Sequence, residues 1–140
     1  ENHSALDGRW ILIEGKINEP QFFASSDITL LPYLYNSSDL SYLTAIKYGC
    51  VPVAFPCGIY NDTIEDIFDN ILTGIGFKAN ISSDTNNEVA FLNAALKALN
   101  LYSENPSGWN LIIKNGINNK LEWNFETIEK YNTIYEKILY

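Results

Sequence analysis

Two kinds of hydrophobic pattern alternate along the chain and predict alternating strands and helices. Apolar runs with few polar interruptions lie at residues 10–14, 27–31 and 51–55. Such runs are typical of parallel strands that are buried on both faces of a sheet. A shorter strand-like piece follows at residues 74–77. Pro52 lacks an N–H group, so the strand at 51–55 is expected to carry it at its start or at an edge of the sheet.

Helices are predicted between and after these runs. Apolar positions three or four residues apart form a stripe in the longer segments, and residues that favour helix ends stand at their boundaries. The predicted helices are a short one up to residue 24, capped by Asn18 with Pro20 in its first turn; residues 40–48, ended by Gly49; a helix that begins at Thr63 with Asp62 as its cap; residues 88–102; a helix from Pro106 to Gly116; and residues 124–140, capped by Asn124.

The stripes also predict which side chains lie in the core. Helix 88–102 is expected to face the sheet with its largest aliphatic residues, and both Trp109 and Trp123 are expected to be core residues. The predicted stripes are Leu40, Leu43, Ala45, Ile46 and Tyr48; Val89, Leu92, Leu96 and Leu99, widened by Phe91, Ala95 and Ala98; and Ile128, Tyr131, Ile134, Tyr135 and Ile138.

The order of the elements, β-α-β-α-β-α-(β)-α-α-α, predicts one α/β domain over residues 1–140. Its parallel strands would be joined by right-handed crossovers, which place helices on both faces of the sheet. Residues 1–8, which include the single histidine His3, are expected to form a frayed tail. The chain starts at Glu1 without an initiator Met, so we expect it to be a piece of a longer protein.

The charge balance argues against nucleic-acid binding. Nine basic and seventeen acidic residues give a net charge of −8, and no cluster of Lys and Arg is present to contact a phosphate backbone. No charged and apolar leader and no apolar run of about twenty residues occurs, so neither a signal peptide nor a membrane span is predicted. A small anion remains possible, because main-chain N–H groups can bind phosphate without a basic side chain.

The two cysteines, Cys50 and Cys57, flank the apolar run at 51–56. An extended segment of this length would hold their Cα atoms too far apart for a disulfide unless it folded back. We therefore expect two buried or partly buried free thiols in a reducing compartment.

Two loops at the carboxyl ends of neighbouring strands predict the ligand site. In an open α/β sheet, such loops form the crevice in which ligands bind. Helix capping by Ser37, Ser38 or Asp39 is the competing interpretation of the first loop, and an ordinary strand–helix turn is that of the second. No Ser-His-Asp, Cys-His or metal-ligand spacing occurs, so no catalytic residue, metal or cofactor is assigned. The candidate binding residues are Asn36, Ser38 and Asp39 in the first loop, and Cys57, Gly58, Ile59, Asp62 and Thr63 in the second.

Several segments, in the same order, resemble the C-terminal Rossmann-type domain of bacterial glycogen synthases and plant starch synthases. The resemblance covers about residues 10–139. The segments that carry it are residues 27–32, 45–53, 62–64, 73–77 and 95–99, together with Trp109, Trp123 and residues 131–135.

The resemblance implies one half of a GT-B glycosyltransferase, which has two Rossmann-like domains with the active site between them. Such enzymes transfer glucose from ADP-glucose or UDP-glucose to an α-1,4-glucan with retention. The implied partners are therefore a nucleotide sugar, an α-glucan and an upstream N-terminal Rossmann-like domain. Since that domain would lie before Glu1, this chain alone is not expected to catalyse transfer. The implied location is the cytoplasm, with a plastid as the alternative.

The chain departs from the family pattern in both loops. Asn36 stands where the family has a Glu that contacts the sugar nucleotide, and Thr44 stands where related families often have a second Glu. Asn cannot act as a general base or carry a negative charge. Ile59 replaces the second glycine of the family's phosphate turn, and Ile strongly disfavours a positive φ.

Three hypotheses follow from these departures. The first is a synthase-like domain whose donor site has degenerated, which leaves a glucan-associated or scaffolding role. The second is a working glycosyltransferase with a different donor, bound by Asn36, Cys57, Gly58 and Asp62. The third is a free-standing α/β module that binds another small anion or a protein partner.

Overall fold

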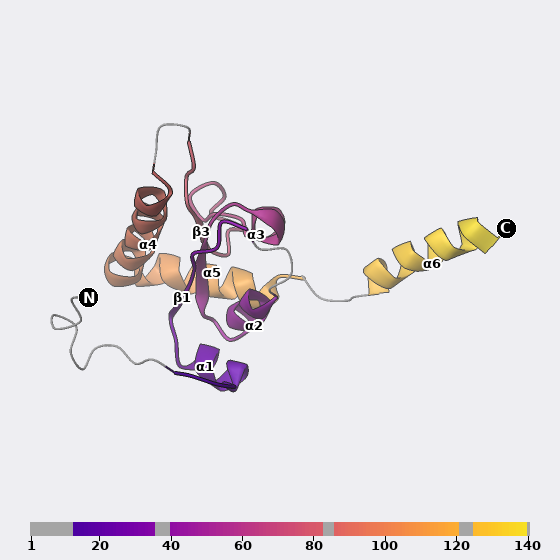
Figure 1. Cartoon of the computed structure of the whole chain (residues 1–140), viewed down its shortest axis with the longest axis horizontal. Coiled ribbons are helices and arrows are strands. Elements are labelled where there is room, and N and C mark those ends of the chain that lie inside the picture. Colours follow the sequence, from indigo (N-terminus) through magenta and orange to yellow (C-terminus); the bar gives the residue numbers. More distant parts are fainter. Residues whose placement is uncertain (1–12, 36–39, 83–85, 121–124, 140) are drawn as a thin grey trace.

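A parallel sheet of three strands, in the order β1-β2-β3, lies at the centre of the computed structural model (Figure 1). The structure describes residues 13–35, 40–82, 86–120 and 125–139. Strand β2 (Val51–Ala54) lies between β1 (Ile28–Leu31) and β3 (Phe77–Lys78), with Ile28 opposite Val51 and Val53 opposite Phe77. The predicted α/β class is confirmed. Residues 10–12 of the predicted first strand lie outside the described residues, and its last two residues, Ile13 and Glu14, are exposed and in no strand.

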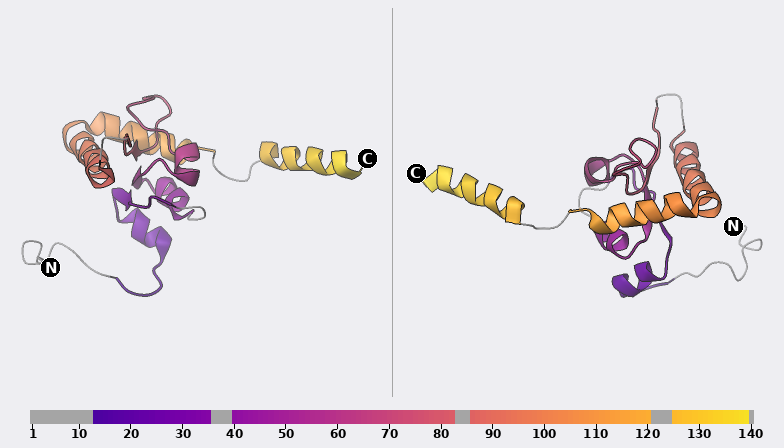
Figure 2. Two further views of the ribbon diagram at one scale, coloured as in Figure 1. Left: turned by 45° about the horizontal axis from the view of Figure 1, so that its top comes forward. Right: turned by 180° about the vertical axis from the view of Figure 1, so that it is seen from behind.

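Helices cover both faces of this sheet, as predicted. Two packed clusters lie on opposite faces of β2: Val51, Val53 and Phe55 contribute to the cluster under α4 and α5, and Ala54 contributes to the one under α2 and α3. Figure 2 shows this arrangement from two further directions. The helices are α1 (Glu19–Ala24), α2 (Ser41–Lys47), α3 (Gly58–Thr63), α4 (Asn87–Glu104), α5 (Pro106–Asn118) and α6 (Phe125–Leu139).

Several helix ends follow the predicted chemistry. The Asn18 side chain accepts from the Gln21 N–H at 3.5 Å with Pro20 in the first turn of α1, and Gly49, with φ +80°, follows α2. The N-cap position of α2 is Leu40, which makes no side-chain cap. The predicted caps Ser37, Ser38, Asp39 and Asn124, and the predicted core residue Trp123, lie outside the described residues.

Pro52 lies in the central strand, which the sequence argument did not predict. Successive residues of a parallel strand direct their main-chain groups to alternate neighbours. Val51 donates to Asp27 next to β1, and Ala54 accepts from Ala79 beyond β3, so Pro52 is on the β3 side. Pairing with β3 begins only at Val53, so the missing N–H of Pro52 costs no ladder hydrogen bond.

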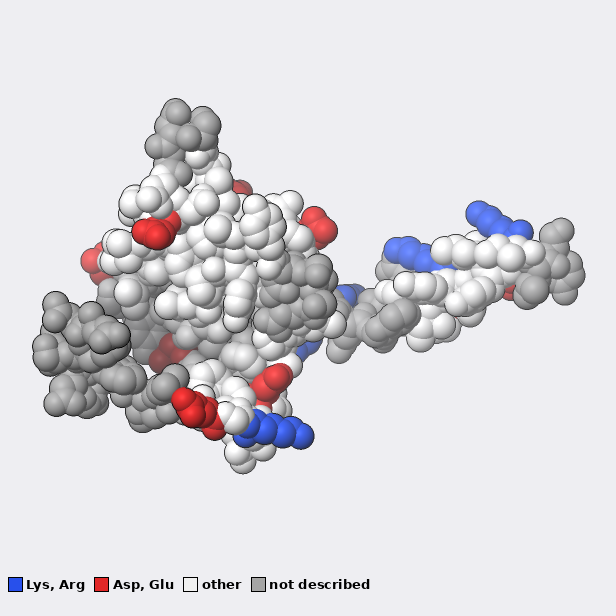
Figure 3. All heavy atoms as spheres, viewed as in Figure 1, with Lys and Arg blue, Asp and Glu red and all other residues white. Residues whose placement is uncertain are grey.

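Charge is spread unevenly over the molecular surface seen in Figure 3. Acidic side chains are scattered singly over the visible part of the body, and the basic side chains lie mainly at its lower edge and on α6. The described residues on this face therefore form no basic patch for a phosphate backbone.

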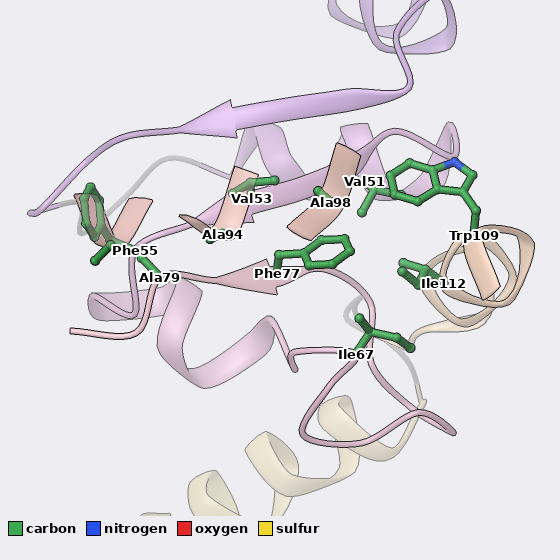
Figure 4. Packing of buried hydrophobic residues seen from close by; sticks show 11 residues of the cluster. Val51, Val53, Phe55, Ile67, Phe77, Ala79, Ala94, Ala98, Trp109 and Ile112 are labelled. Carbon is green, nitrogen blue, oxygen red and sulfur yellow. The ribbon is translucent and has the colours of Figure 1, made fainter. Parts of the chain in front are cut away.

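The larger of the two clusters is built around Phe77. Its ring stacks on Trp109 of α5 with centroids 6.3 Å apart, and Figure 4 shows it lying between β2 and Ile112. Trp109 is buried, as predicted. The aromatic pair therefore joins the last strand to α5 across the sheet face.

The buried face of α4 is opposite to the predicted row of Val89, Leu92, Leu96 and Leu99, whereas Ala98, which was predicted to widen that stripe, is buried. Ala90, Ala94 and Ala98 are buried, whereas the predicted stripe is roughly half exposed: Val89 49%, Leu92 57%, Leu96 45% and Leu99 51%. At 100° per residue the two rows lie on nearly opposite sides of the helix. The alanine row lets the α4 backbone approach β2 and β3 closely, and larger side chains would not fit there.

A similar close approach corrects the predicted end of α5. Gly116 is a buried residue inside the helix, which continues to Asn118, and does not end it. A Cβ at Gly116 would lie 2.8 Å from Cγ2 of Ile46 in α2. The Lys47 ammonium also donates to the Ile117 and Asn119 carbonyls at 3.1 and 2.9 Å, which fixes the end of α5 on α2.

The predicted apolar stripe of α2 is only partly buried. Ala45 and Ile46 face the core, but Leu40 and Tyr48 are exposed, and Tyr42, which was not in the stripe, is fully buried. Tyr42 belongs in the core because its hydroxyl has a hydrogen-bond partner in α3.

Helix α6 forms as predicted and lies away from the sheet and its helices in Figure 1. Its apolar row is exposed: Ile128, Tyr131, Ile134, Tyr135 and Ile138. Among the described residues, no helix is long and apolar enough to cross a membrane.

The burial pattern of α4 predicts that substitutions in its alanine row destabilise the protein more than substitutions in its leucine row. A buried leucine stripe would predict the reverse. We expect Ala94→Leu to lower the free energy of unfolding by about 1–3 kcal/mol, because it overpacks a buried contact. We expect Leu99→Ala to lower it by about 1 kcal/mol or less, because half of that side chain is already in water. Urea unfolding followed by tryptophan fluorescence measures both values. A larger effect at Leu99 would contradict the assigned helix face.

Candidate functional site

The loops that follow β1 and β2 meet at the carboxyl edge of the sheet. The Cys57 thiol donates to the main-chain oxygen of Tyr33 at 3.0 Å. Tyr33 lies two residues after β1, and Cys57 lies three residues after β2. The predicted proximity of the two loops is thus confirmed for their described residues.

The second loop turns directly into α3. Cys57 is the N-cap in an extended conformation, and Gly58 is exposed with φ +48° in the left-handed region. The sequence argument placed the helix start at Thr63 with Asp62 as its cap, and this is wrong, because Asp62 is an exposed residue inside α3. Gly58, with its left-handed backbone conformation, lets the chain turn into α3 soon after β2 ends. Helix propensities do not predict such a turn, so the sequence argument placed the helix start too late.

Two of the candidate binding residues, Ile59 and Thr63, hold α3 against α2. The Ile59 side chain is partly buried against the cluster that contains Tyr42 and Tyr60, whose rings lie edge to face at 5.2 Å. Thr63 Oγ1 donates to the Ile59 carbonyl at 2.6 Å and lies 2.7 Å from the Tyr42 hydroxyl. Since the Thr63 proton is already donated, Tyr42 is the donor of the second bond.

The structure therefore separates the candidates into groups. Cys57, Gly58 and Asp62 lie at or near the surface of the second loop, while Ile59 and Thr63 serve the contact between helices. Asn36, Ser38 and Asp39 lie outside the described residues. Thr44 is half-buried in α2.

Asp66 is a buried carboxylate that the sequence argument missed. Its Oδ1 accepts from the Phe68 N–H at 2.8 Å and its Oδ2 accepts from the Lys78 N–H at 2.7 Å. The first bond is the i to i+2 pattern that Asp often makes in turns, and this was the available signal. The second bond satisfies a main-chain donor of β3, so Asp66 fixes the loop before β3 against that strand.

Both cysteines are free, as predicted. Cys50 is buried, and the pKa of its thiol is raised to about 11, first by burial and then by the nearby negative charge of Asp27. Cys57 is half-buried at the loop contact. Within the part of the chain that the structure describes, no group of three or more His, Cys, Asp or Glu side chains could hold a metal ion.

Several relatives with similar sequences are named glycogen synthase. The chain is 33% identical over 120 residues to the glycogen synthase of Geotalea daltonii, and 30% identical to those of Clostridium perfringens, over 119 residues, and Thermotoga maritima, over 121. The matches cover 85–86% of this chain. The chain is a homologue of the glycogen synthases. It corresponds to their C-terminal domain and spans about a quarter of their length, 23–24%.

A solved structure shares the fold seen here. It is the catalytic domain of starch synthase IV from Arabidopsis thaliana, bound to ADP and acarbose. The match covers 82% of this chain and 23% of the solved chain, with a TM-score of 0.69 and a sequence identity of 23%. The parallel sheet and its helices therefore have the fold of the matched part of that structure. No model of a known protein family matches the chain.

The hydrogen bond between Tyr42 and Thr63 predicts a measurable loss of stability. We expect Thr63→Val to lower the free energy of unfolding by about 1–2 kcal/mol, because a buried hydroxyl loses its acceptor. Thr73→Val is the matched control, since its hydroxyl donates to Glu65 at the surface, and it should cost less than about 0.5 kcal/mol. Urea unfolding measures both, and equal losses would show that the Tyr42 bond contributes nothing.

The environments of the two thiols predict their order of reaction. At pH 8 we expect Cys57 to react with a disulfide reagent first and Cys50 to react only on unfolding, because the thiolate is the nucleophile and burial disfavours it at Cys50. Cys57→Ser should remove the fast absorbance change and Cys50→Ser should leave it. Faster reaction of Cys50 in the folded protein would contradict the structure.

Proposed function

We propose that this chain forms the nucleotide-sugar side of a glucosyltransferase that extends an α-glucan. Its homology to glycogen synthases over 85–86% of its length supports the reaction class. The observation that carries the site assignment is the contact of the two loops at the carboxyl edge, held by the bond from Cys57 to Tyr33. Ligands of open α/β sheets bind at this edge.

The proposed donor site uses the main chain more than side chains. Gly58 is exposed and has no Cβ, so a sugar nucleotide can approach the backbone of the turn closely. Ile59 stands where the family that the sequence resembles has a second glycine, but its side chain packs against the cluster that contains Tyr42 and Tyr60. This packing leaves the exposed side of Gly58 open to the donor.

The chemical step needs groups that this chain does not supply. In a retaining transfer the bond from the anomeric carbon to the diphosphate breaks, and a bond to the glucan hydroxyl forms on the same face. We assign no catalytic residue among the described residues. The acceptor side and the groups that stabilise the leaving diphosphate are assigned to a second, N-terminal Rossmann-like domain. The cytoplasm is the expected location, and a plastid is the alternative.

A second candidate function is a glucan-associated scaffold whose donor site no longer works. Two observations favour it: Asn36 stands where a Glu contacts the donor in the family that the sequence resembles, and the Ile59 and Thr63 side chains are committed to the contact with α2. Restoration of Glu at position 36 alone would not reverse the change at Ile59.

Donor binding to the full-length protein separates the two candidates. We expect calorimetry to detect binding of ADP-glucose or UDP-glucose with a Kd between about 1 µM and 1 mM. The same ligand should slow the reaction of Cys57 with thiol reagents, because that thiol lies beside the proposed site.

A pair of glycine variants provides the matched control. Gly58→Val places a branched side chain in the left-handed region at the proposed site, and we expect binding to weaken at least tenfold. Gly15→Val introduces the same strain at φ +100°, with no atom near its Cβ, and should leave binding unchanged. If ADP-glucose, UDP-glucose and ADP all fail to bind while the protein is retained on a glucan column, the scaffold replaces the enzyme as the conclusion.

A further inference from the structure

Three adjoining cavities run along the outer side of β3 and the neighbouring face of α4. Their volumes are about 440, 330 and 460 Å³, and they share Lys97 as a lining residue. We call them together the polar trough, which is lined chiefly by Phe68, Lys78, Asn80, Asn93, Lys97 and Asn100. Pro56, next to Cys57 in the sequence, is one of the lining residues, so part of the trough lies beside the proposed donor turn.

The α4 wall of the trough carries two amide side chains and two charged ones beside four apolar residues, Ala90, Ala94, Leu96 and Leu101. Asn93, Lys97 and Asn100 are spaced four and three residues apart, which places them on one side of the helix. Each Asn side chain offers two donors and one acceptor oxygen, so it can bind a hydroxyl that donates as well as one that accepts. Asn80 adds a further amide from the segment after β3.

An exposed aromatic ring completes the trough. Phe68 is 60% exposed, and its ring is held against Phe77 at 6.0 Å and beneath the Lys97 ammonium at 5.6 Å. The Asp66 carboxylate fixes the Phe68 main chain from below. The ring is therefore positioned before any ligand arrives, with part of its surface open to solvent.

The charges along the trough are mixed. Lys78 and Lys97 are accompanied by Asp66, Asp69 and Glu104. This balance gives little net attraction for a phosphate. An apolar helix such as α6 would bury the Asn93 and Asn100 amides without hydrogen-bond partners, which costs free energy.

We propose that the polar trough binds a segment of α-glucan chain outside the reaction centre. Glucose units present many hydroxyls, which the amides can bind, and an apolar C–H face, which can pack on Phe68. Because Pro56 lines the trough, a bound chain could pass close to the donor turn. The identity of this ligand rests on the proposed function, which supplies the α-glucan as acceptor.

Retention of the full-length protein by glycogen in a native gel tests the trough, with maltoheptaose titration as the second measurement. We expect Phe68→Ala and Asn100→Ala each to weaken binding at least fivefold. Ala is the better helix former at position 100, so a loss there cannot come from a weakened α4. Phe22→Ala, which removes a 40% exposed ring on α1, is the control and should not change retention.

The outcomes separate this inference from the proposed function. ADP-glucose affinity should be the same in wild type and in Phe68→Ala. If donor binding is absent but Phe68 and Asn100 still determine glycogen retention, the proposed enzyme fails and the trough stands. If neither variant changes retention, the trough assignment is wrong. It is also wrong if inorganic pyrophosphate or 0.5 M salt, about the concentration that screens exposed charges, displaces the glucan.

Discussion

The complete burial of β2 is the constraint on which the rest of the structure depends. All four of its residues, Val51–Ala54, are buried. Val51 and Val53 point to α4 and α5, Ala54 points to α2 and α3, and β1 and β3 take up its main-chain groups on either side. A strand in this position must be apolar throughout, and its neighbours must approach closely because β2 is short.

The close approach explains where small residues stand. Alanine lines the face of α4 that meets the sheet, and Gly116 allows α5 to touch α2 at Ile46. At Gly76, a Cβ would lie 2.6 Å from the Pro52 carbonyl oxygen, so only glycine fits beside the central strand. The larger aliphatic residues of α4, such as Leu92 and Leu96, lie on the opposite face of the helix, where they are about half exposed.

One short segment, α3 with its N-cap, contributes some residues to the proposed site and others to the packing of the fold. In α3 and its N-cap, Ile59 and Thr63 bind the segment to α2, while Cys57 contacts the loop after β1 and Gly58 stays exposed. The Ile59 side chain thus serves the packing of α3 and not the proposed site. On the other side of Pro56 the polar trough follows α4, so the turn lies at the junction of two surfaces with different chemistry. Together they would place a donor and a glucan on one edge of the domain.

The sequence alone determined the order of the elements from α1 onward, most helix ends and the meeting of the two loops. These depend on local chemistry: continuous apolar runs at 27–31 and 51–55, the Asn18 cap and Gly49 each work within a few residues. Only the tertiary structure decided which face of α4 is buried, because the fit of alanine against β2 and β3 is a property of the spacing between elements. It likewise decided that Pro52 is tolerated in the central strand, that Gly116 is a contact, and that Asp66 binds the main chain of Lys78, twelve residues later. Each of these depends on a partner distant in sequence, and periodicity along one segment carries no information about that partner.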